Sequence, residues 1–257
     1  MRDRAREVID AYRRSHDEVS AQVANFEQED LLRASGARGW NVAQVLSHLG
    51  SSSETALSTL RSGATDPSAA PAVWARWDAM DPEVQAQEFV RAEGELVRAL
   101  EALDDVFMAS HRINLGFLPV PVDVATFVAM RLSEVGLHRW DVDVAFSPNA
   151  TVASYLVPTL LNGIPQMAPM LARPEGLVGI IAFDVTDPDH TLTLRMTADR
   201  ATMTDDHDDG AGTLVHLPAE SFVRLTSGRL RPENTPKSIQ IEGERTLDEI
   251  RRIFPGY

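Results

Sequence analysis

Two histidines and one glutamate stand where they could hold a metal ion together. Glu134 and His138 are four residues apart in a stretch whose apolar spacing predicts a helix, so both point the same way with Cβ atoms about 5–6 Å apart. His48 lies in the apolar run VAQVLSHL of another predicted helix, on or beside its inward face. Three protein ligands with a fourth position open are typical of catalytic zinc, and bundle interiors commonly build such sites from facing helices.

A glutamate and a histidine at this spacing also occur as an ordinary surface ion pair, worth only about 0.2–0.5 kcal/mol. The apolar neighbours Met130 and Leu137 favour the metal site, because they place Glu134 and His138 across the inward stripe of the helix. An acid on that stripe needs a partner, since an unpaired buried charge is very costly. Among the other histidines, His16 has charged and polar neighbours, and we expect it to be exposed to solvent.

The composition narrows the chemistry that such a site could perform. The chain has 257 residues, no cysteine, and 38 acidic against 24 basic side chains, for a formal charge of -14. Without cysteine there is no disulfide, no thiolate zinc site and no catalytic thiol, so any thiol chemistry must use a thiol from outside. The acidic excess argues against nucleic acid as a partner and against a polybasic contact with a membrane surface.

The amino-terminal stretch is charged throughout and lacks the apolar run of a signal peptide. The most apolar stretches are much shorter than the roughly 20 residues that a spanning helix needs. We therefore expect a cytoplasmic protein that does not enter a membrane.

Four amphipathic helices must position the candidate ligands. Apolar residues at helical spacing predict them over residues 2–28, 41–62, 82–103 and 122–146. Asn41 is suited to the N-cap of the second helix, and loops are expected over Ala64–Val73 and Asn114–Pro121. This pattern predicts a four-helix bundle domain over residues 1–149.

The character of the chain changes after residue 149. Alternating and β-branched runs predict strands over residues 177–185, 191–197, 201–204, 213–217 and 238–242. Helices are predicted over residues 152–171, 218–226 and 246–254. Residues 150–257 are therefore expected to form a small α+β domain with an antiparallel sheet, and the whole chain is placed in the two-domain α+β class.

The stretches WNVAQVLSHL and GFLPVPVDVATFVAMRLSEVGLHRWDVDVAF resemble the mycothiol-dependent maleylpyruvate isomerase family. The likeness consists of a tryptophan that opens the second helix, a histidine eight residues later, and an R-x2-E-x3-H-x2-D string on the fourth. In this chain those residues are Trp40, His48, Arg131, Glu134, His138 and Asp141. The family joins a DinB-like metal-binding bundle to an α+β domain similar to sterol-carrier folds, so the resemblance covers nearly the whole chain.

The resemblance implies a divalent metal, with zinc the expected ion, held by His48, Glu134 and His138. It implies mycothiol, a low-molecular-weight thiol of actinobacteria, as cofactor or cosubstrate, and a small electrophilic molecule as substrate. The metal-bound thiolate would attack that electrophile. It further implies an arginine of the second domain that binds substrate carboxylates; Arg229, in LTSGRL, is the candidate and Arg224 its rival.

Asp141 is expected to hold a ligand histidine from outside the metal site, and Arg131 to act electrostatically in a similar way. Within the family, S-transferase and cis–trans isomerase activity both remain open, and we favour a transferase of unknown substrate. If the chain is not an enzyme, the alternative function is that of a non-catalytic protein that binds a small ligand or lipid and keeps a structural metal. A third hypothesis is a regulatory protein that sequesters a partner. We expect a monomer.

Overall fold

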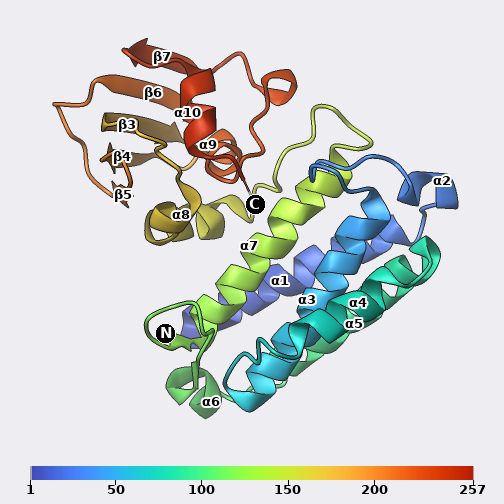
Figure 1. Cartoon of the computed structure of the whole chain (residues 1–257). Coiled ribbons are helices and arrows are strands. Elements are labelled where there is room, and N and C mark those ends of the chain that lie inside the picture. The colour runs from blue at the N-terminus through green and yellow to red at the C-terminus, as the bar shows by residue number, and fades with distance from the viewer. Residues whose placement is uncertain (1, 257) are drawn as a thin grey trace. The chain divides into compact units, whose positions relative to one another are not determined.

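The computed structural model describes residues 2–256 and is shown in Figure 1. The chain divides into two compact units, Met1–Ala150 and Thr151–Tyr257. The first is helical and the second is built on a sheet (Figure 1). The predicted two-part α+β fold is thereby confirmed.

Within the described part of the first unit, four long helices form a bundle. These are α1 (Arg2–Val23), α3 (Val42–Ser62), α5 (Pro82–Glu101) and α7 (Val124–Asp143). Helix α3 packs against α5 and α7, and α1 packs against the same two helices. Their apolar stripes form the core, in which Leu46, Leu49, Phe89, Leu132 and Val135 are all fully buried.

The two helices that carry the candidate ligands have well-defined starts. Asn41 caps α3, since its Oδ1 accepts a hydrogen bond from the backbone N–H of Gln44 at 2.8 Å. Oε1 of Gln44 in turn accepts from the backbone N–H of Asn41 at 2.9 Å. Asp123 caps α7 through the backbone N–H of Thr126. These caps satisfy N–H groups that a helix leaves without partners, and they fix where each helix begins.

Shorter elements connect the long helices. They are α2 (Gln28–Leu31), α4 (Ala70–Asp78), α6 (Asp105–Ser110) and a small ribbon of β1 (Arg112–Ile113) with β2 (Val122–Asp123). The loop predicted over Ala64–Val73 is wrong at its end, because α4 begins inside it. Trp77 of α4 is completely buried against α3, where Gly50 leaves room for the indole. This contact, which no local pattern reveals, stabilises the helix.

The prediction for His16 is also wrong. Its side chain is buried in α1, with only 7% of the residue exposed. The space for the ring is provided by Gly94 of α5, since a Cβ at that position would lie 3.3 Å from Nε2 of His16. Burial lowers the pKa of His16, so the ring is favoured in its neutral form.

The described part of the second unit holds a five-stranded sheet in the order β5-β4-β3-β6-β7. Its strands are β3 (Gly179–Thr186), β4 (His190–Met196), β5 (Ala201–Thr204), β6 (Thr213–Pro218) and β7 (Gln240–Gly243). Strands β3 and β6 pair in parallel, whereas the other neighbours are antiparallel. The sheet is therefore mixed rather than wholly antiparallel, because the segment after β5 carries the chain to the far side of β3.

Three helices belong to the described part of this unit: α8 (Val157–Leu171), α9 (Ala219–Thr226) and α10 (Leu247–Ile253). A short 3-10 turn, η1 (Pro232–Asn234), follows α9. Helix α8 packs on β5, and α9 packs on β3 and β6. Alternate residues along the strands, such as Phe183 and Val215, fill the core beneath the helices.

Among the helices of residues 2–256, none combines the length and the apolar character that crossing a bilayer would require.

Candidate metal centre

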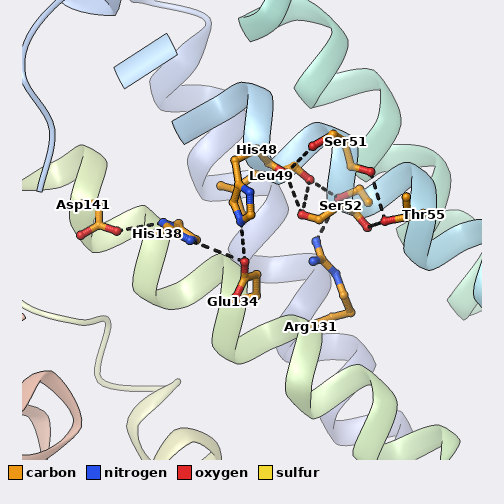
Figure 2. A network of polar contacts seen from close by, with 10 residues as sticks. His48, Leu49, Ser51, Ser52, Thr55, Arg131, Glu134, His138 and Asp141 are labelled. Carbon is orange, nitrogen blue, oxygen red and sulfur yellow. Dashed lines mark hydrogen bonds and ion pairs between the residues drawn. The ribbon is translucent and has the colours of Figure 1, made fainter. Parts of the chain in front are cut away.

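The fold brings His48, Glu134 and His138 together inside the helical unit. Each offers one ligand atom, and these atoms all lie within 4.8 Å of one another. Nε2 of His48 is 2.6 Å from Oε1 of Glu134, and Nε2 of His138 is 3.5 Å from the same oxygen. Figure 2 shows the two imidazoles directed at this carboxylate from α3 and α7. Two helices that pack against each other thus join residues 86 positions apart in sequence.

The three side chains differ in their exposure. The side chain of His138 is 4% exposed, that of Glu134 is 24% exposed, and that of His48 is 32% exposed. The site is therefore sunk into the bundle on the His138 side and accessible to solvent on the His48 side.

The charge of Glu134 suits a metal ligand. Burial alone would raise the pKa of its carboxyl group, but hydrogen bonds from His138 and His48, with the nearby charge of Arg131, hold that pKa well below its usual value. Glu134 is thus a carboxylate at neutral pH, and a carboxylate with two imidazoles is a donor set that Zn²⁺ accepts.

Asp141 fixes the orientation of His138. Its Oδ2 lies 2.8 Å from Nδ1 of His138, and the aspartate side chain is almost entirely buried. With a cation bound at this site, Nδ1–H of His138 would donate to Asp141, and the lone pair on Nε2, the atom nearer Glu134, would face the ion in place of a proton. The backbone N–H of Gly36 donates to the carbonyl oxygen of Asp141 at 2.7 Å, and a Cβ at Gly36 would clash with this residue.

The indole ring of Trp40 lies beside the imidazoles of the two histidines. Its ring centroid lies 5.2 Å from that of His48 and 6.2 Å from that of His138, with the second pair stacked. The indole is partly exposed. Trp40 precedes the N-cap of α3, so the start of this helix places it next to the ligands.

Two buried polar residues near the site, Tyr12 of α1 and Glu93 of α5, received no role from sequence reasoning. Glu93 lies four residues after Phe89 and four before Val97, both buried, so it occupies the apolar stripe of its helix. A charged residue on an otherwise apolar stripe is the signal that could have found it.

The two candidate arginines of the second unit are both buried. Arg224, in α9, pairs with Glu220 at 2.6 Å and donates from Nη1 to the carbonyl oxygen of Asn234. These bonds satisfy the buried guanidinium of Arg224 and give this residue a structural role. Arg229 follows α9 and donates from Nη1 to the carbonyl oxygen of Ser227 at 3.1 Å. That Arg229 binds a substrate stays a prediction.

Comparisons with known proteins agree on one group. A family model described as the mycothiol maleylpyruvate isomerase N-terminal domain matches residues 12–143, about half of the chain. The chain is similar in fold to the crystal structures of the mycothiol-dependent maleylpyruvate isomerase and of a histidine-to-alanine mutant of it. In both cases the identity is 14%, the TM-score is 0.67, and 95% of each chain is covered. No curated protein matches the chain.

Proposed function

The chain belongs to the family of the mycothiol maleylpyruvate isomerase N-terminal domain, and on this premise we propose that it is a metal-dependent enzyme that uses mycothiol on a small electrophile. The observation that carries the proposal is the cluster of His48, Glu134 and His138 within the matched domain. Its ligand atoms are close enough to share one cation, and it leaves a coordination position for an outside molecule.

The residues fit a divalent ion of the zinc type. The donors are imidazole nitrogens and one carboxylate oxygen, and the cysteine-free chain adds no thiolate of its own. When bound, such an ion supplies positive charge that deprotonates a coordinated thiol at neutral pH. Two neutral imidazoles and one carboxylate leave a divalent site with a net charge of about +1, which favours a thiolate as the next ligand.

The chain's own residues have separate tasks in this proposal. His48, Glu134 and His138 hold the ion, and Asp141 keeps Nε2 of His138 available for it. The accessible side near His48 admits the thiol and the electrophile. Arg229 is proposed to bind a carboxylate of the substrate, on the strength of its place in the sequence LTSGRL.

Two reactions follow from one first step. The sulfur of mycothiol forms a bond to one alkene carbon of the electrophile, and the neighbouring carbon receives a proton, so the double bond becomes single. After rotation about that bond, loss of the same proton and cleavage of the C–S bond give the trans alkene and return the thiol. If the C–S bond is kept instead, the product is the thioether of an S-transferase.

The test begins with the metal content of the purified protein. We expect one divalent ion per chain in the wild type and none in His138→Ala, with His216→Ala, in the second unit, as a histidine control. Mycothiol loss is then followed with a panel of electrophiles, and isomerisation of maleylpyruvate is followed in parallel. A wild type that takes up no metal contradicts the proposal. Metal uptake without any thiol-dependent turnover favours a protein that only binds a small ligand.

A further inference from the structure

A polar cluster lies inside the apolar core of the bundle, behind the candidate metal centre. It takes one residue from each of α1, α3, α5 and α7: Tyr12, Ser53, Glu93 and Arg131. All four are buried, and Tyr12, Ser53 and Glu93 have no exposed surface. Charged residues are almost never found at such positions unless they are paired.

Few contacts satisfy this cluster. Nη2 of Arg131 donates a hydrogen bond to Oγ of Ser53 at 3.1 Å. Among the described residues, Nε of Arg131, both carboxyl oxygens of Glu93 and the hydroxyl of Tyr12 have no hydrogen-bond partner of ordinary geometry. Electrostatic interactions connect Arg131 to Tyr12 and Glu93. Well-packed apolar residues often serve stability equally well in place of a buried ion pair, so stability alone does not require charged residues at these positions.

Its position in the fold gives a reason. Arg131 stands three residues before Glu134 on α7, and Ser53 stands five residues after His48 on α3. The Arg131–Ser53 hydrogen bond therefore joins the two helices that carry the candidate ligands, about one turn from the ligands themselves. Figure 2 shows the guanidinium of Arg131 reaching from α7 toward α3 beside the His48–Glu134 contact.

We propose that Arg131 is a positioning residue of the metal centre: its hydrogen bond to Ser53, backed by Glu93 and Tyr12, sets the spacing of α3 and α7 and hence the geometry of His48 with Glu134 and His138. This inference rests on the proposed metal site.

The charges agree with this role. The positive charge of Arg131 also interacts with Glu134, so it attracts the ligand carboxylate as well as bridging the helices. Burial raises the pKa of Glu93 to about 7, although Arg131 counteracts this. Near neutral pH a substantial part of Glu93 is thus uncharged, and Arg131 is incompletely neutralised from that side.

The experiment measures Co²⁺ binding, whose visible absorption reports coordination geometry. The variant Glu93→Gln/Arg131→Met removes both buried charges at similar volume, so no unpaired charge is left in the core. We expect it to keep the helical circular dichroism of the wild type but to bind Co²⁺ about 10-fold or more weakly, the usual range for outer partners of a metal site, with a changed absorption spectrum. Arg139→Gln, on the same helix but paired with Glu18, is the matched control and should bind like the wild type.

A second variant covers a failure of the double variant to fold. Ser53→Ala removes only the acceptor of the bridge and should weaken Co²⁺ binding by a few-fold, with the same direction of spectral change. If the double variant folds and has the affinity and spectrum of the wild type, the inference is overturned and the metal site stands. If only Ser53→Ala folds, the same result in that variant has the same meaning. A wild type that binds no Co²⁺ would overturn the proposed function and this inference together.

Discussion

Oδ2 of Asp141 lies 2.8 Å from Nδ1 of His138, at a place where both side chains are nearly inaccessible to solvent. The backbone carbonyl of Asp141 is held in turn by Gly36. This contact selects the ring nitrogen that His138 presents to Glu134. The fold itself therefore sets the orientation of this candidate ligand.

Asp141→Ala should therefore lower metal affinity by about 10–100-fold, because it removes the acceptor that orients His138. Asp141→Asn keeps an acceptor and loses only the charge, so its effect should lie at the lower end of that range. Competition with a chromophoric chelator measures both affinities. Asp143→Asn, two residues further along α7 and bonded to Gln22, is the control and should not change the affinity. Equal affinities for the wild type and Asp141→Ala would count against the role of this contact.

Replacing Gly50 by alanine should cause a large loss of stability, although it adds only one methyl group. A Cβ at this position would lie 2.2 Å from the buried indole of Trp77, so Gly50→Ala forces α4 away from α3. Overpacking of this kind typically costs about 1–3 kcal/mol in the free energy of unfolding, which urea titration followed by circular dichroism measures.

Gly163→Ala is the control for adding a methyl group to a helical glycine, since nothing lies within 4 Å of a Cβ there. It should leave stability unchanged or raise it by up to about 1 kcal/mol. Trp77→Leu in the Gly50→Ala background should regain part of the loss. A Gly50→Ala protein as stable as the wild type would mean that α4 does not pack tightly on α3.

The helices that carry the candidate ligands could be predicted from sequence because their signals are local. Apolar spacing marks α3 and α7, and Asn41 marks the start of α3. Spacing alone also paired Glu134 with His138. That His48 joins them depends on α3 packing against α7, a tertiary contact that the resemblance supplied and periodicity could not.

Other features lacked a local signal. Helix α4 depends on Trp77 entering the space at Gly50, and the parallel pairing of β3 with β6 depends on the path of the chain after β5. Sequence alone does not decide whether Glu93 is buried, because a glutamate on an apolar stripe can also mark the edge of a solvated face. Only the surrounding helices decide between these possibilities.

Because Glu93 is buried, we expect the free energy of unfolding to depend on pH in a specific way. Burial raises its pKa from 4.5 to about 7 in the folded protein, so the folded state keeps a proton that the unfolded state has released. The stability that this proton contributes is present below about pH 4.5 and is lost as the pH rises to about 7. The loss is on the order of 3 kcal/mol.

Urea unfolding of the wild type and Glu93→Gln at several pH values between 5 and 8 measures this effect. The free energy of unfolding of the wild type should fall relative to that of the variant as the pH increases. The variant serves as the reference, because other groups that titrate, such as Asp143, change in both proteins alike. Two curves that run parallel across this range would show that Glu93 keeps its ordinary pKa.

Metal binding should stabilise one unit of the protein and leave the other unchanged. His48, Glu134 and His138 all belong to the first unit, and binding to the folded state alone adds about 2.7 kcal/mol when the free ion is at 100 times its Kd. Hydrogen exchange with and without Zn²⁺ locates this gain: backbone amides of α3 and α7 should exchange more slowly, and those of β3 and β4 should not change. His48→Ala should abolish the protection and His216→Ala should retain it. If Zn²⁺ instead slows hydrogen exchange mainly in the sheet of the second unit, the cation binds there and the proposed site at His48 is wrong.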